Sequence, residues 1–422
     1  MLFSMKAFPA AIVADSKGRI TERPILAAAG RSEHEIFPLD AAQLIPLPAT
    51  SRLYLLPGRR ALGFNRNGEI NVMGGGSAVA AFLPPGYIAL QLAAYKTAPG
   101  APRLPLYCYC ALCWFRGKFC VPALRVDRDR RHSIARCEQS RAERAVGRWI
   151  KKYPGNRLVA HHGLVCVKKY ACANAVNLFL RRWEAPIAVS GGCNASCLGC
   201  ISRQDCRSVR APQERIGFVP TVKEILEVAV PHLEKAPRAF VSFGQGCEGE
   251  PLLKGGLIES AIREIRKITK RGIIHLNTNG SLPGVIEKLA AAGLDSIRIS
   301  LNSAQPELYK AYYRPRGYSF NDVIESFRTA RDAGLWISAN YLTFPGVTDS
   351  PAEYRAFSGL LENNLLDMIQ WRNLNIDPEL YLDTVDRACH GKRQESMGIK
   401  NLMKRIRRCF PEVRFGYFNK SA

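Results

Sequence analysis

The feature that most constrains the fold of this chain is a regular alternation of strand-like and helix-like segments that begins near residue 185. Six short apolar runs each precede or follow a stretch with the 3.6-residue period of a helix; the runs occupy residues 186–190, 238–243, 273–278, 295–301, 335–342 and 367–373. Strands that alternate with helices form a parallel sheet. We therefore predict an α/β unit whose sheet is open or closed into a partial barrel.

Several of these strands carry polar side chains on one face. In residues 295–301 the apolar side chains share one face, while Arg298 and Ser300 share the other with Asn302. The same alternation recurs at His275, Asn277, Ser338, Asn340, Gln370 and Arg372. Parallel strands covered by helices are normally apolar on both faces. The pattern predicts a polar lumen that holds a ligand; the alternative is a network of buried polar groups bonded to one another.

The rest of the chain follows other patterns. Residues 1–184 mix short apolar runs with turn signals such as DSKG and NRNGE, which is typical of a mostly β or α+β domain. Near the C-terminus, NLMKRIRRCF predicts a basic helix before a last strand. We predict three parts: an N-terminal domain (1–184), the barrel core (185–375) and a C-terminal extension (376–422).

Charge and cysteine content indicate the environment of the protein. Lys and Arg outnumber Asp and Glu by 60 to 36, a formal charge of +24. This charge predicts RNA as a partner, with residues 125–132 and 403–408 as phosphate contacts; a bias spread over the whole surface is the alternative. The uncharged residues 70–95 contain Gly and Pro clusters that argue against a membrane span. We expect a cytoplasmic protein without membrane contact, in which the clustered cysteines among the 14 indicate metal binding or catalysis.

Three of these cysteines lie close together after the first predicted strand. Cys193, Cys197 and Cys200 are separated by three and then two residues, at the end of a parallel sheet where active sites lie. A structural zinc site needs four ligands, the fourth coming from Cys206 or elsewhere. An iron–sulfur cluster held by three thiolates keeps one iron open for a substrate or cofactor. Spacing alone leaves both sites open.

The Cys193-x-x-x-Cys197-x-x-Cys200 loop resembles the signature loop of the radical S-adenosylmethionine (AdoMet, SAM) enzymes. The resemblance implies a partial (β/α)6 TIM-type barrel in which the three cysteines bind a 4Fe–4S cluster and AdoMet chelates the fourth iron, so that Cys206 is not a ligand. It also implies reductive cleavage of AdoMet to a 5′-deoxyadenosyl radical, which abstracts hydrogen from a substrate. An electron donor such as flavodoxin or ferredoxin is implied with it.

Further residues match the family's AdoMet contacts. The segment Gly249-Glu250-Pro251, after the second strand, resembles the element that holds the methionyl ammonium, with Gly249 and Glu250 as binding residues. Asn277, Ser300 and Asn302 resemble the polar contacts to the carboxylate and ribose, and Arg314 is a further partner for the carboxylate. The loop departs from the family at Gly199, where an aromatic residue usually precedes the third cysteine near the adenine.

Other cysteines suggest additional chemistry. Cys247 lies in the loop that carries Glu250, and we predict a catalytic thiol there; the alternative is a small core residue. A second metal site, zinc or an auxiliary iron–sulfur cluster, is predicted at Cys108, Cys110, Cys113 and Cys120. The histidines 161 and 162 are further ligand candidates or simply polar surface residues.

The substrate is not determined by the fold or the cofactor. The charge favours RNA modification, and GEPLL (249–253) is similar to the corresponding loop of the family's RNA adenosine methyltransferases. The alternative within the family is a peptide- or protein-modifying maturase or activase. The non-enzyme alternative is a zinc-stabilised nucleic-acid-binding protein, which would be colourless and would not cleave AdoMet.

Overall fold

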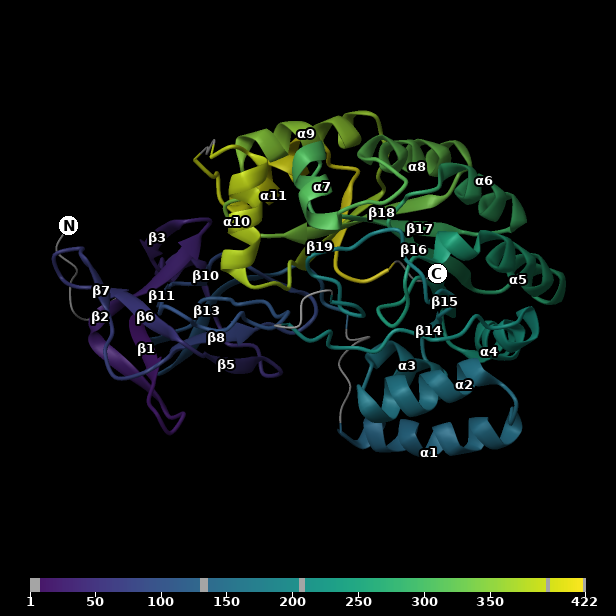
Figure 1. The fold of residues 1–422 in the computed structure, drawn as a ribbon, viewed down its shortest axis with the longest axis horizontal. Helices are drawn as coiled ribbons and strands as arrows, with labels where there is room; N and C mark the ends of the chain where they lie inside the picture. The colour runs from purple at the N-terminus through teal and green to yellow at the C-terminus, as the bar shows by residue number, and fades with distance from the viewer. Residues whose placement is uncertain (1–7, 130–135, 205–208, 392–394, 420–422) are drawn as a thin grey trace.

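The computed structural model describes residues 8–129, 136–204, 209–391 and 395–419. The C-terminal half is built on one parallel sheet, teal to yellow in Figure 1. Its strands lie in chain order: β14 (Glu184–Ile187), β15 (Phe240–Phe243), β16 (Ile273–Thr278), β17 (Ser296–Leu301), β18 (Trp336–Thr343), β19 (Met368–Asn373) and β20 (Arg414–Gly416). Every neighbouring pair is parallel. The predicted α/β partial barrel is confirmed, with β20 as a seventh strand.

The predicted crossover helices are also present. They are α4 (Val222–Lys235), α5 (Gly255–Ile268), α6 (Pro283–Ala292), α8 (Phe320–Asp332) and α9 (Pro351–Glu362). Local signals set their ends: Thr221 and Glu224 form a capping box at the start of α4. Gly293 ends α6 in a left-handed conformation, with φ 112°.

Two helices in this half were not predicted: α7 (Pro306–Tyr313) and α10 (Pro378–Ala388). The buried face of α7 consists largely of tyrosines 309, 312 and 313, so its helical period was not apparent as an apolar one. The predicted basic helix is confirmed as α11 (Ile399–Cys409). Because β20 belongs to the barrel sheet, a boundary at residue 375 divides one sheet, and the division into three parts stays a prediction.

The N-terminal region is α+β. An antiparallel sheet contains β1 (Ala10–Ala14), β2 (Ile20–Ser32), β3 (Glu35–Pro38), β4 (Leu44–Pro46), β6 (Arg59–Phe64), β7 (Ile70–Val72), β9 (Tyr87–Ala89), β10 (Leu92–Ala93), β11 (Tyr95–Thr97), β12 (Cys113–Phe115) and β13 (Lys118–Arg125), while β5 (Arg52–Leu56) pairs with β8 (Ala78–Phe82). After it come α1 (Arg136–Lys152), α2 (Arg157–Ala160), the π-helix η2 (His161–Lys169) and α3 (Ala173–Phe179). These helices lie against β14 and α4 (Figure 1).

The N-terminal sheet packs beside the carboxyl end of β19. Asn373, the last residue of β19, accepts a hydrogen bond from the Ala89 amide at 2.8 Å and donates to the Tyr87 carbonyl at 2.9 Å. Asp377 accepts from the Leu104 amide at 2.7 Å. These contacts place the N-terminal sheet at the edge of the barrel mouth. No helix among the described residues is long and apolar enough to cross a membrane.

Candidate active site

The cysteine loop and the Gly-Glu-Pro loop are joined directly at the barrel mouth. The amide of Gly249 donates to the Ser190 carbonyl at 2.6 Å, and the amide of Glu250 donates to the Gly192 carbonyl at 2.8 Å. A Cβ atom on Gly249 would lie 1.8 Å from the Gly192 oxygen. Only glycine allows this close approach of the two backbones, so the contact between the two loops requires Gly249.

Cys193, Cys197 and Cys200 line a cavity of about 420 Å³ at the carboxyl ends of the strands. All three are half-buried free thiols, and burial raises the pKa of Cys193 and Cys197. Three soft thiolate donors around one cavity fit an iron–sulfur cluster that keeps one iron open.

Glu250 lines the same cavity and is 3% exposed. Its carboxylate accepts hydrogen bonds from the Thr278 hydroxyl at 2.5 Å and from the amides of Leu252 and Asn279 at 3.0 and 2.8 Å. Burial outweighs these bonds and raises the pKa of Glu250 to about 7. A cation bound beside this carboxylate would lower the pKa again, so the site is built to gain from binding one.

Glu248 is a site residue that the sequence analysis missed. It is buried, and its carboxylate accepts four backbone N–H groups at 2.7 to 3.0 Å, from Val189, Ser190, Gly244 and Gln245. Two of these donors follow β14 and two follow β15. One side chain thus fixes the two functional loops relative to each other, with burial raising its pKa to about 7. An acidic residue two positions before the motif glutamate was the available signal.

Arg215 is the second residue that was missed. Its guanidinium donates to the sulfur of Cys200 at 3.5 Å and to the Ser202 hydroxyl at 3.1 Å. It lines the cavity on the side of the cysteines. Hydrogen bonds and positive charge at a ligating sulfur tune the potential of a metal cluster. Arg215 lies in a loop without periodicity, so the sequence carried no sign of this contact.

The predicted AdoMet-binding residues divide into two groups. Asn277 and Ser300 line the cavity, as the polar strand faces suggested. Asn302 is buried and donates to the Leu308 carbonyl and the Tyr381 hydroxyl, both at 3.3 Å, and it does not line that cavity. Arg314 is exposed and lines a smaller cavity shared with Arg203 and Arg387. Roles for Asn302 and Arg314 in AdoMet binding stay predictions, which this geometry does not favour.

The polar strand faces do two things inside the barrel. Deeper groups bond to one another: His275 contacts Ser296 at 2.7 Å and Asn277 at 3.0 Å. The upper groups line the open cavity, among them Arg298 and Arg372. Both alternatives considered for the polar faces therefore occur, at different depths.

Arg298 and Arg372 form no ion pair with any described residue. Arg298 donates to the side chains of Gln370 and Asn419 at 3.1 and 3.3 Å, and Arg372 donates to the Tyr417 carbonyl at 2.8 Å. The Nε atom of each arginine is buried and has no described partner. Burial, together with the charge of Arg372, lowers the pKa of Arg298 to about 9. Buried charges are normally paired, so this part of the cavity is suited to an anion.

The absence of a side chain at Gly199 leaves room for a tyrosine of α7. A Cβ atom at this position would lie 2.6 Å from the Tyr312 hydroxyl oxygen. The Gly199 amide donates to that hydroxyl, and Tyr312 and Tyr313 line the cavity beside the cysteines. Aromatic rings are therefore present at the position where the loop itself lacks one, and they come from a helix that is distant in the chain.

Cys247 points away from this cavity. Its neighbours Gly246 and Glu248 are among the lining residues, but its own thiol contacts the side chains of His161 and Cys166. A catalytic role for Cys247 stays a prediction without support from this placement.

The predicted second metal site is not assembled as a single-ion site. The thiols of Cys110, Cys113 and Cys120 contact the carbonyls of Pro122, Cys120 and Phe115 at 3.7, 3.4 and 3.9 Å. Burial raises the pKa of all four cysteines from 108 to 120. A metal site there stays a prediction. Cys206 and residues 130–132 lie outside the described residues.

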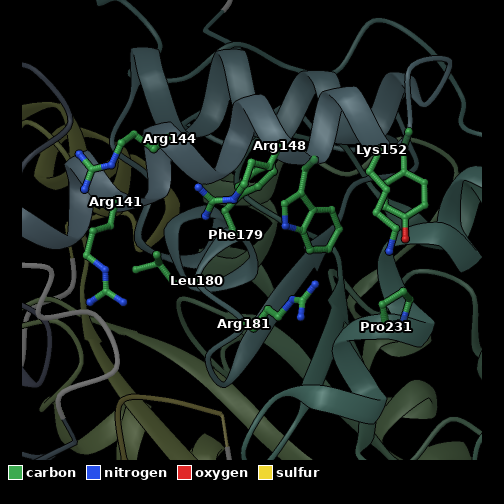
Figure 2. Close-up of a pocket in the computed structure, with 10 residues that line it drawn as sticks. Arg141, Arg144, Arg148, Lys152, Phe179, Leu180, Arg181 and Pro231 are labelled. Atoms are coloured by element: carbon green, nitrogen blue, oxygen red, sulfur yellow. The ribbon is translucent and has the colours of Figure 1, made fainter.

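A second cavity, of about 600 Å³, lies apart from the barrel between α1, the end of α3 and α4 (Figure 2). Arg141, Arg144, Arg148 and Lys152 follow one another along α1 and, with Arg181, surround it. None of these five forms an ion pair with a described residue. We call this cavity the basic hollow.

Of the two basic segments predicted to contact phosphates, 403–408 lies on α11, where Arg405 and Arg407 stack on Tyr354 and Phe415.

Comparison with known proteins agrees with this geometry. Residues 187–357 match the Radical SAM superfamily, so this part of the chain is a radical SAM domain. The family implies a 4Fe–4S cluster and SAM as cofactors. The predicted resemblance to the radical SAM enzymes is confirmed over these residues.

Individual relatives are similar over the same region. The GTP 3′,8-cyclase of Streptomyces coelicolor is 27% identical over 39% of this chain and 46% of its own length; that of Petrotoga mobilis is 30% identical over 40% and 49%. The chain thus spans about half the length of the curated relatives it matches. A crystal structure of methylornithine synthase aligns over 57% of this chain and 76% of its own, at 16% identity and a TM-score of 0.36.

Proposed function

We propose that this chain binds a 4Fe–4S cluster on Cys193, Cys197 and Cys200 and uses AdoMet to abstract a hydrogen atom from an anionic substrate held in the barrel. The shared cavity carries this proposal, since the three free thiols, the Glu250 carboxylate and the polar strand ends all line it. When bound and reduced by a donor such as a flavodoxin or ferredoxin, the cluster supplies the electron that cleaves AdoMet to a 5′-deoxyadenosyl radical.

The residues around the cavity have separate tasks in this proposal. Glu250 accepts hydrogen bonds from the methionyl ammonium, because its buried carboxylate gains most from a cation. Asn277 and Ser300 offer polar groups to the rest of AdoMet. Tyr312 and Tyr313 supply apolar ring surface next to the cysteines, where the loop has Gly199.

The substrate class follows from the two arginines. Arg298 and Arg372 bring two positive charges to the cavity, against one described carboxylate on that side, Glu184. A phosphate or carboxylate of the substrate would pair with them, as planar guanidinium groups pair with such anions. The relatives named GTP 3′,8-cyclase support a nucleoside triphosphate as the first compound to test.

The test is AdoMet cleavage by protein purified and reconstituted with iron and sulfide without oxygen. After reduction, the wild type is expected to form 5′-deoxyadenosine, with more formed when GTP is present. Cys193→Ala should abolish the product, while Cys409→Ala, at an exposed cysteine, should not. No 5′-deoxyadenosine from the wild type would refute the proposal. Cleavage that Arg298→Leu leaves unchanged with every anionic substrate tried would refute the substrate class.

The basic hollow favours a second candidate, RNA as the substrate. Five cations that form no ion pair with a described residue surround one cavity together with Trp149 and Tyr153, and this combination suits phosphates and stacked bases. Binding of a labelled single-stranded RNA should weaken steeply with salt, and the double variant Arg144→Glu/Arg148→Glu should lower the salt slope by about two. Binding that does not respond to salt or to this variant would remove RNA from consideration.

A further inference from the structure

Four metal-ligating side chains meet in a place that the proposed function does not use. His161 and His162 begin the π-helix η2, and Cys166 follows within it. Cys247 comes from the loop after β15. The ligand atoms of these four residues all lie within 4.8 Å of one another, and His162 Nδ1 lies 3.7 Å from the sulfur of Cys166.

One ring nitrogen of each histidine in this cluster lacks a hydrogen-bond partner among the described residues. His162 is completely buried, and its Nε2 atom has no described hydrogen-bond partner; the same holds for Nε2 of His161. Cys166 and Cys247 are 3% and 7% exposed. Leaving a buried imidazole nitrogen unpaired costs about 1 to 3 kcal/mol.

We propose that His161, His162, Cys166 and Cys247 bind one zinc ion. Two imidazoles and two thiols are a common structural zinc set, and four protein ligands leave no open position for catalysis. The two thiols lose their protons when the ion binds, so that Zn²⁺ and two thiolates form a neutral centre and two protons are released. Tetrahedral zinc holds its donors about 3.3 to 3.8 Å apart, which these side chains reach by a small contraction.

The local backbone explains how neighbouring histidines share one site. In a regular α-helix, residues 161 and 162 would point about 100° apart. The π-helical turn changes this register, and such turns occur frequently at functional sites. The two rings lie edge to face with centroids 5.7 Å apart. Cys166 is then four and five positions away, over the same turn as both rings.

The ion would tie together two parts of the chain. Three of its ligands belong to the helical region before the barrel, and the fourth belongs to the loop that carries Glu248 and Glu250. The carbonyl of Cys247 also accepts from the Ile216 amide at 2.8 Å. Zinc bound to Cys247 would therefore stabilise the loop that carries Glu250 on the side that faces away from the cavity.

Metal analysis of the full-length protein, purified without chelators, tests the proposal. We expect one zinc per chain in addition to the cluster iron. Cys247→Ser and Cys166→Ser should each lose the zinc and keep the iron, whereas Cys193→Ala should lose iron and keep zinc. Cys172→Ser is the matched control, because Cys172 lies nearby but outside the four-donor set. Zinc absent from the wild type, or retained by both serine variants, would overturn the proposal.

X-ray absorption at the zinc edge tests the ligand set on the wild type, independently of how any variant folds. The expected shell has two sulfur atoms at about 2.3 Å and two nitrogen atoms at about 2.0 Å. A shell of four sulfurs would move the ion to other cysteines, and an oxygen shell would indicate surface binding. Either result would refute this site. The cluster iron does not contribute to this edge, so loss of the proposed enzyme activity leaves the result unaffected.

Discussion

Replacing Gly199 with alanine tests whether Tyr312 occupies the place that the cysteine loop leaves empty. The added Cβ atom would lie 2.6 Å from the Tyr312 hydroxyl oxygen and 3.4 Å from the Asn375 carbonyl oxygen. The tyrosine cannot swing aside easily, because it is 4% exposed and its ring packs edge-on against Tyr313 and Tyr381, at 5.0 and 6.1 Å. Overpacking of this kind costs about 1 to 3 kcal/mol, and we expect about 2 for Gly199→Ala.

Removing the hydroxyl should relieve that strain. In Tyr312→Phe the nearest ring atom to the new Cβ would be Cζ, at 3.5 Å, an ordinary contact. The single variant Tyr312→Phe loses the bond from the Gly199 amide, at a cost of about 1 kcal/mol. The double variant should then cost about 1 kcal/mol instead of the additive 3, a coupling of about 2 kcal/mol.

The assay is urea unfolding of the four proteins of this cycle, compared by midpoint at constant slope. AdoMet affinity is measured in parallel, because Tyr312 also lines the cavity. Strictly additive destabilisation would refute the contact between Gly199 and the Tyr312 hydroxyl. A Gly199→Ala variant as stable as the wild type would refute the proposed steric requirement for glycine at this position.

Three further predictions concern the same cavity. Burial raises the pKa of Glu250 to about 7, and an ammonium binds the ionised carboxylate, so AdoMet affinity should fall about tenfold per pH unit below 7. The variant Glu250→Gln should bind AdoMet weakly at every pH. A wild-type affinity that does not change with pH would contradict this prediction. Arg215→Met removes a charge and a donor at Cys200, so the cluster potential should fall by roughly 60 mV in a redox titration, which corresponds to about 1.4 kcal/mol; an unchanged potential would argue against the contact. The Gly249→Ala variant would place a Cβ atom 1.8 Å from a backbone oxygen and should destabilise the protein by about 3 kcal/mol. The control is Gly256→Ala, in open space on α5, which should be neutral or slightly stabilising. Equal effects of the two substitutions on stability would refute the close approach at Gly249.

The barrel was predictable because its signals are local. Strand and helix periods, caps and turn glycines each occupy short segments, and six strands with five helices followed from them. Two helices were missed for physical reasons. In α7 the buried face is made of tyrosines, which carry a polar group each. In α10 a capping aspartate and several charges obscure the apolar face.

Among the polar residues predicted from the strand pattern, those that lie within a strand line the cavity. Asn277 and Ser300 lie within β16 and β17, so their alternation determines their direction. Asn302 comes after β17 has ended at Leu301, where the period of two no longer holds, and its side chain turns to Leu308 and Tyr381. Arg215, Glu248 and the four residues of the proposed zinc site meet through tertiary packing of loops, for which a sequence has no periodic signal.

The loop from Gly244 to Glu250 has no regular secondary structure, yet side chains fasten it in three directions. Glu248 binds the amides that follow β14 and β15, Glu250 binds the end of β16, and Cys247 faces the π-helix. Each set of contacts involves a different residue, so one set can be lost while the others remain. Loss of zinc at Cys247 would leave the cysteine loop and its iron in place but free the back of the loop that positions Glu250. The proposed zinc site should therefore affect AdoMet affinity more than cluster content, which separates its role from that of Cys193, Cys197 and Cys200.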